Sequence, residues 1–247
     1  MFYILFFIAG LVAGCGSSDD MATGTPVPQN PTPQNPQPQN PTETTTVRYL
    51  ALGDSYTIGQ SVCATCRFPE QLKSQIQVQR PETTVDLKLI ATTGWTTSNL
   101  LQAIQDQDPS SDQDLVTLLI GVNNQYQHQS FSIYETEFVA LVNKAIVLAK
   151  GDKDKVIVVS IPDYAYTPFG QNLPNPENVS LELAQYNTFA QNYCTSAGIT
   201  FVNITDITQM GLQYPNLVAS DGLHPSEQAY TQFMQRILPL ALEKLPQ

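Results

Sequence analysis

Strand-like and helix-like segments alternate along this chain from Val47 onward. Five segments rich in β-branched and aliphatic residues are predicted strands: 47–53, 85–91, 115–121, 155–161 and 199–204. Between them, apolar residues at three- and four-residue spacing predict helices over 68–78, 98–105, 131–150 and 181–197, and a last helix begins at Pro225. Parallel strands need such crossovers, so the pattern predicts a mainly parallel sheet with helices on both faces.

The length and charge of the chain narrow its class further. It has 247 residues, of which 42% are hydrophobic, and we assign 47–247 to one domain with one core. The net charge is −11, and the 11 basic side chains form no cluster. Nucleic-acid binding depends on neutralising phosphates, so we expect no nucleic-acid partner.

The first 14 residues resemble a bacterial lipoprotein signal peptide. Residues 1–12 are almost wholly apolar but too short to span a membrane, which takes about 20 residues. The following Val12-Ala13-Gly14-Cys15 resembles a lipobox, which implies cleavage before Cys15 and lipid attachment to its thiol. From the lipobox resemblance we expect an extracytoplasmic protein of the bacterial cell envelope, anchored to a membrane through Cys15. The alternative is an ordinary signal peptide that is followed by a free cysteine.

A proline-rich linker, 15–46, follows the signal. Pro-Gln-Asn-Pro begins at Pro28, Pro33 and Pro38, and such a tract cannot build a core. It favours the extended polyproline II conformation, and at ~3.1 Å per residue the segment 26–41 would span roughly 50 Å. The linker is predicted to hold the domain away from the membrane.

The three remaining cysteines divide into a pair and a single residue. Cys63 and Cys66 share a loop, and an exported protein can keep a disulfide, so they form a candidate pair. The same spacing suits half a zinc site, but the chain has only one such motif and two histidines, so we expect no metal. Cys194 lies in a helical pattern and is predicted to be buried.

Chemistry-bearing residues follow the first predicted strand and precede the last helix. Ser55 comes directly after Gly53-Asp54, where open α/β sheets place their ligands, although a helix-capping serine would also fit. A serine nucleophile needs a histidine base, and the base needs an acid to orient it. Of the two histidines, His128 lies in a polar loop, whereas His224 follows Asp221 by three residues. The candidate triad is Ser55, Asp221 and His224.

An oxyanion hole would supply the second catalytic element. Gly94 follows the second strand, where a glycine lets a backbone N–H approach a ligand, and Asn123 follows the third strand with an amide that can donate. A turn glycine and a helix cap are the alternatives. All these points lie at the carboxyl ends of one sheet and can converge. The Gly-x-Ser-x-Gly elbow is absent, which disfavours the α/β-hydrolase fold.

These segments together resemble the four sequence blocks of the SGNH, or GDSL-type, hydrolases. The blocks are Gly53-Asp54-Ser55, Gly94, Gly121-Val122-Asn123 and Asp221-Gly222-Leu223-His224-Pro225. The resemblance implies a flavodoxin-like three-layer α/β/α sandwich with a five-stranded sheet. It also implies that Ser55 is the nucleophile, His224 the base and Asp221 its orienting acid, and that the Ser55 N–H, Gly94 N–H and Asn123 side chain form the oxyanion hole. The family usually has aspartate where this chain has Asn124, so we expect a structural carboxylate contact to be lost here.

The predicted function is hydrolysis of carboxylic esters through an acyl-enzyme, with no metal and no cofactor, by a monomer. Short acyl or acetyl esters of a carbohydrate or lipid are the expected substrates, and lysophospholipase or thioesterase activity is the alternative. A rival from another class is a non-catalytic envelope lipoprotein that binds a glycan or partner in the same cleft. Tyr56, Trp95 and Tyr126 are candidates to line its mouth.

Overall fold

Five parallel strands form the central sheet of the computed structural model, which describes residues 44–245. The strands are β1 (Thr45–Gly53), β2 (Thr83–Ala91), β3 (Leu115–Leu119), β4 (Val156–Val159) and β5 (Thr200–Val202). Their order is β2-β1-β3-β4-β5, and every neighbouring pair is parallel. This is the flavodoxin-like order, so the predicted fold class is confirmed. The predicted signal, Cys15 and nearly all of the linker lie outside the described residues.

The strand order places a switch point beside β1. The chain leaves β1 for β2 on one side and then crosses to β3 on the other, and ligands bind at such reversals in open α/β sheets. The register makes the carboxyl ends of these strands level, because Gly53 pairs with Ala91 of β2 and with Leu119 of β3. The loops that follow the three strands therefore start at one edge.

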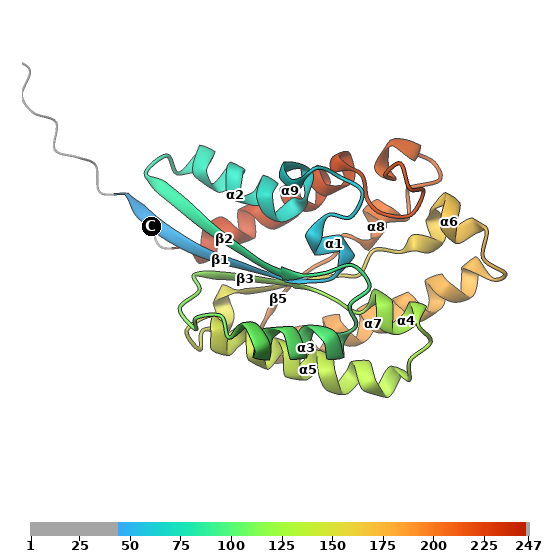
Figure 1. The fold of residues 1–247 in the computed structure, drawn as a ribbon, viewed down its shortest axis with the longest axis horizontal. Coiled ribbons are helices and arrows are strands. Elements are labelled where there is room, and N and C mark those ends of the chain that lie inside the picture. Colours follow the sequence, from blue (N-terminus) through green and yellow to red (C-terminus); the bar gives the residue numbers. More distant parts are fainter. Residues whose placement is uncertain (1–43, 246–247) are drawn as a thin grey trace, which may run out of the picture. The chain divides into compact units, whose positions relative to one another are not determined.

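Helices cover both faces of the sheet (Figure 1). One layer holds α1 (Ser55–Ile58), α2 (Phe68–Gln79), α8 (Thr205–Thr208) and α9 (Glu227–Lys244). The opposite layer holds α3 (Thr97–Gln107), α4 (Val122–Tyr126), α5 (Phe131–Leu148) and α7 (Pro176–Ala197). The short α6 (Pro168–Gln171) and the 3-10 turns at Ala64–Cys66, Lys153–Lys155, Tyr164–Tyr166 and Pro215–Leu217 lie in the connections.

The core is continuous between these layers. The strand residues Leu50, Leu52 and Leu118 are fully buried, and the predicted apolar face of α9 is buried against the sheet. Cys194 is buried as expected, and burial raises the pKa of its thiol to about 12. In residues 44–245, no helix combines the length and apolar character that a membrane crossing requires.

Two helix starts differ by two or more residues from the sequence prediction. The helix α7 begins at Pro176 rather than residue 181, because proline is favoured in the first turn even though the next residues are polar. The last helix begins at Glu227 rather than Pro225: Ser226 caps it by accepting the N–H of Ala229, and Pro225 pairs with Val218 in an isolated bridge. Strand β1 begins at Thr45, two residues before the predicted strand.

Candidate active site

Ser55 is held where β1 turns into α1. The Asp54 carboxylate accepts the backbone N–H of Tyr56 at 3.0 Å, which caps the short helix that Ser55 begins. A glycine is required before it, since a Cβ at Gly53 would lie 2.1 Å from Thr57 Oγ1 and 2.4 Å from the Leu119 carbonyl oxygen. The hydroxyl of Ser55 has no hydrogen-bond partner within the described chain. Such bonds are often long in ligand-free enzymes and tighten when substrate binds.

Asp54 is a buried acid with an incomplete set of partners. Its side chain is 0% exposed, and Oδ2 has no hydrogen bond among the described residues. Burial raises the pKa of Asp54 from 3.8 to about 7, against the opposing effect of nearby backbone N–H groups. The folded state therefore holds this proton more tightly than the unfolded state does.

An Asp54→Asn variant should gain thermal stability over wild type as the pH rises. Between about pH 4 and about pH 7 the unfolded wild type loses the Asp54 proton while the folded protein retains it, so the free energy of unfolding falls across this range. Asparagine cannot ionise and can still cap Tyr56 through Oδ1. Melting curves at about pH 5 and about pH 8 test this: a difference in Tm that shrinks toward pH 8 would contradict the shifted pKa.

His224 and Asp221 form a close pair in the loop before α9. Nδ1 of His224 lies 2.6 Å from Oδ2 of Asp221, and Oδ1 of Asp221 accepts the backbone N–H groups of Leu223 and His224 at 2.9 and 3.0 Å. Partial burial acts to raise the pKa of Asp221, but these bonds and one from Ser61 outweigh it and hold the pKa well below its usual range. Asp221 is thus a charged acceptor that orients the imidazole.

Sequence reasoning missed a third partner of Asp221. The Ser61 hydroxyl donates to Asp221 Oδ2 at 2.6 Å across 160 residues. Ser61 has a φ of 68°, which is unusual for a residue other than glycine, and it lies two residues before the Cys63–Cys66 disulfide. In the same loop, Gln60 accepts the Thr93 hydroxyl at 2.7 Å. One loop therefore contacts both Asp221 and the segment next to Gly94.

Removing the Ser61 hydroxyl should lower kcat by about tenfold, since a hydrogen bond to a charged group contributes about 1.5–3 kcal/mol and this one is partly exposed to water. Ser61→Ala removes the hydroxyl but keeps the unfavourable φ, whereas Ser61→Gly removes both. Equal losses in the two variants would assign the effect to the hydroxyl. Near-wild-type kcat in Ser61→Gly would show that backbone conformation alone explains any loss in Ser61→Ala.

The predicted oxyanion donors lie on the next two loops. Gly94 has a φ of 86°, and a Cβ there would meet no atom within 4 Å, so conformation rather than space calls for glycine. Asn123 is half-buried in the first turn of α4, and its Nδ2 donates to the Trp95 carbonyl at 2.9 Å. An amide nitrogen carries two N–H groups, so this bond orients the side chain and leaves a second donor.

Four of the predicted site residues line one cavity of about 250 Å³: Ser55, Gly94, Asn123 and His224. Asp221 lies behind His224 as its partner. The rest of the wall is largely aromatic and aliphatic, and includes Tyr56 and Tyr126 as expected. Trp95 does not line it; its half-buried ring packs against the core instead, while its carbonyl accepts from Asn123.

Asn124, the departure from the family pattern, is fully buried and well bonded. Its Oδ1 accepts the Thr97 N–H at 3.0 Å, and its Nδ2 donates to Thr97 Oγ1 at 2.6 Å and to Gln129 Oε1 at 3.0 Å. The neutral amide therefore ties α4 to the start of α3 without a carboxylate.

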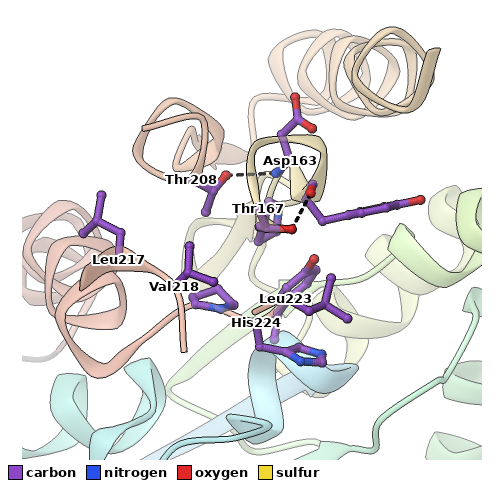
Figure 2. Close-up of a pocket in the computed structure, with 11 residues that line it drawn as sticks. Asp163, Thr167, Thr208, Leu217, Val218, Leu223 and His224 are labelled. Atoms are coloured by element: carbon purple, nitrogen blue, oxygen red, sulfur yellow. Dashed lines mark hydrogen bonds between the residues drawn. The ribbon is translucent and has the colours of Figure 1, made fainter. Parts of the chain in front are cut away.

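The region behind His224 is closely packed. Figure 2 shows Leu223 and His224 beside Val218, with Thr208 accepting the Asp163 N–H at 2.9 Å on the far side. The hollow between them measures about 10 Å³, which is the room of one water molecule at most. A ligand must therefore approach Ser55 from the larger cavity. Among residues 44–245, no group of three or more His, Cys, Asp or Glu side chains is placed to hold a metal ion.

Most of the domain matches a known protein family in sequence. Residues 51–232 match the model of the GDSL-like lipase/acylhydrolase family, a range that contains all five predicted site residues. The chain belongs to this family. No curated protein has a significant match to the sequence.

Solved structures of the same fold resemble this GDSL domain at low sequence identity. A lipase/acylhydrolase from Enterococcus faecalis is 17% identical, with a TM-score of 0.63 over 81% of this chain and 97% of that one. An acetylxylan esterase from Geobacillus stearothermophilus is 19% identical, with a TM-score of 0.61 over 81% and 96%. A lipolytic G-D-S-L family protein from Veillonella parvula is 18% identical, with a TM-score of 0.59 over 80% and 97%. At these identities the likeness concerns the fold.

Proposed function

We propose that this GDSL domain is a serine esterase that cleaves short acyl esters through an acyl-enzyme. The observation that carries the proposal is the single cavity onto which Ser55, His224, Gly94 and Asn123 open, with Asp221 fixed behind His224. A nucleophile, a base and donors for a developing oxyanion are the groups that acyl transfer requires. The family supports ester hydrolysis in general, and the acyl length and mechanism are proposals.

Each residue of the site has its own role in the proposed reaction. Neutral His224 takes the proton of the Ser55 hydroxyl as Oγ attacks the acyl carbonyl carbon. The oxygen that gains charge is stabilised by the N–H groups of Ser55 and Gly94 and by Asn123 Nδ2. His224 then gives its proton to the leaving alcohol, and Ser55 keeps the acyl group. Water repeats the sequence, with His224 again as base, and releases the acid.

Cavity size favours a short acyl group over a fatty acyl chain. The cavity at Ser55 is about 250 Å³, below the range of about 300–1,000 Å³ typical of ligand pockets, and it adjoins a second cavity that polar side chains line in part. A series of p-nitrophenyl esters from acetate to palmitate tests this. We expect kcat/KM to be highest for acetate to butyrate. A maximum at long chains would favour the alternative lysophospholipase or thioesterase activity.

The rival binding function makes a different prediction. A non-catalytic lipoprotein would be folded and would bind a glycan or partner in the cleft, but it would release no product from any ester. Turnover that requires Ser55 excludes it.

We also propose that the mature protein is anchored to a membrane of the cell envelope by lipid on Cys15. The support is the lipobox-like sequence and the proline-rich spacer that follows it. Replacing Cys15 by serine is expected to move the protein from the membrane fraction to the soluble extracytoplasmic fraction, because serine lacks the thiol that accepts the lipid. Fractionation and immunoblotting measure this, and a variant that stays with the membrane like wild type contradicts the anchor.

A further inference from the structure

A second cavity of about 300 Å³ adjoins the one that contains Ser55. The two share Tyr126 of α4 and Tyr164, which follows β4, as part of their walls. The second cavity continues from there to the start of α7, where Asn175, Asn178 and Glu182 line it. These shared walls place the second cavity next to the first.

Several polar groups of this second cavity are free to bind a ligand. The side chains of Asn178 and His128 are exposed and form no hydrogen bond within residues 44–245. Glu182 uses Oε2 to accept Gln125 Nε2 at 2.7 Å, while Oε1 has no bond there. An Asn side chain both donates and accepts, and a carboxylate accepts, so the wall can pair with hydroxyl groups of either polarity.

A buried network fixes part of this wall. Gln125 is only 3% exposed. Its Oε1 accepts the Tyr164 hydroxyl at 2.8 Å, and its Nε2 donates to Oε2 of Glu182. Glu182 is thus oriented before any ligand binds, which lowers the entropy lost on binding.

Tyr126 adds an aromatic surface between the two cavities. Its ring packs against Tyr164 and Phe169, with ring centroids 6.1 and 6.3 Å away, yet 49% of the residue remains exposed. An aromatic ring held in place with an open side can cover the apolar C–H face of a ring that carries hydroxyls on its edge.

The charged side chains that line the two cavities indicate which leaving alcohols can bind there. Neither cavity is lined by Lys or Arg among the described residues, whereas Glu182 lines the second one. Phosphate groups bind best to Arg, Lys or clustered backbone N–H groups, and the chain carries a net charge of −11. The cavity therefore suits an uncharged hydroxyl-rich group and disfavours a phosphate-bearing one.

We infer that the second cavity binds a neutral sugar unit of the leaving alcohol, so that the substrate is a short-chain acyl ester of an oligosaccharide. This inference rests on the proposed esterase function and adds the substrate class and the residues that select it. The acylated sugar would lie at Ser55, with a neighbouring sugar between Tyr126 and Asn178.

The test keeps the acyl group constant and varies the alcohol. The substrates are an O-acetylated monosaccharide, an O-acetylated oligosaccharide of neutral pyranoses and an O-acetylated sugar phosphate, with p-nitrophenyl acetate as the activated reference ester. Among the three sugar esters, we expect wild type to show the highest kcat/KM for the acetylated oligosaccharide. A higher value for the acetylated sugar phosphate, or equal values for the two neutral saccharides, would overturn the inference.

Variants locate the effect in the second cavity. The quantity compared is kcat/KM for the acetylated oligosaccharide divided by that for p-nitrophenyl acetate. Asn178→Ala should lower this ratio about fivefold, the effect of one neutral hydrogen bond, and Asn178→Trp should lower it further by filling the cavity. Asn192→Ala is the matched control: Asn192 is exposed on the same helix, also has no side-chain hydrogen bond, and lines neither cavity.

The outcomes separate the two proposals. Turnover of p-nitrophenyl acetate with a ratio that neither Asn178 variant changes contradicts the sugar-binding cavity and leaves the esterase intact. A wild type that hydrolyses none of the acetyl esters while remaining folded contradicts the esterase and the cavity assignment together.

Discussion

Replacing Ser55 by alanine is expected to lower kcat for p-nitrophenyl acetate by about 10⁶-fold, the loss seen when a catalytic serine is removed from a triad that acts as a unit. The physical reason is that Ser55 lines one cavity with His224 and with the predicted oxyanion donors Gly94 and Asn123, so its loss removes the group that would attack the acyl carbon. Product release in the first turnover and in the steady state should be measured together. The rapid first release that reports the acyl-enzyme should disappear as well.

The stability of this variant and a second substitution provide the controls. The Ser55 hydroxyl forms no hydrogen bond within the described chain, so the Tm of Ser55→Ala should stay close to that of wild type. His224→Gln should be nearly as inactive, and the double variant should be no worse than either single one, because both residues serve the same step. Activity within about tenfold of wild type in Ser55→Ala would show that another group is the nucleophile.

Replacing Asn123 by alanine is expected to lower kcat by about 10²–10³-fold, or about 2.7–4 kcal/mol, with little change in KM. The second N–H of its amide is free to stabilise the oxyanion, which exists in the transition state but not in bound substrate. Steady-state kinetics on p-nitrophenyl acetate measure both constants. Loss of the single bond to the Trp95 carbonyl should cost little stability because Asn123 is only half-buried.

Asn124→Ala is the neighbouring contrast, and the structure changes what it should do. Sequence reasoning expects a mild variant, because this side chain is not assigned to the oxyanion hole. Asn124 is fully buried with three side-chain hydrogen bonds. Its removal leaves the buried N–H of Thr97 unpaired, although the Thr97 hydroxyl still donates to Glu137, and should lower the Tm markedly. Below its Tm it should keep most of its kcat. If Asn124→Ala loses more kcat than Asn123→Ala while still folded, the oxyanion assignment is mistaken.

The sequence alone is enough to predict the layers of this domain and the candidate catalytic residues. An apolar run such as 115–121 is typical of a strand that is buried on both faces of a sheet. Parallel strands need crossover connections, which are usually helices, so the same pattern also predicts the helical layers. The candidate residues follow strands at their carboxyl ends, where the sheet itself brings them to one edge. The chemistry of Ser55, Asp221 and His224 then limits the roles each can take.

Only the tertiary structure decides the contacts between loops. Nothing in the local pattern around Ser61 points to Asp221, 160 residues away, because the packing of α2 against α9 brings together the loops that precede these helices. The start of α9 depends likewise on a bridge between Val218 and Pro225, and the inward packing of Trp95 depends on the space left by its neighbours. The second cavity forms where α4 meets the start of α7, although more than 45 residues separate these two helices in the sequence. Sequence periodicity reports which side of an element is buried, whereas pairings between loops depend on distances that only the packed layers set.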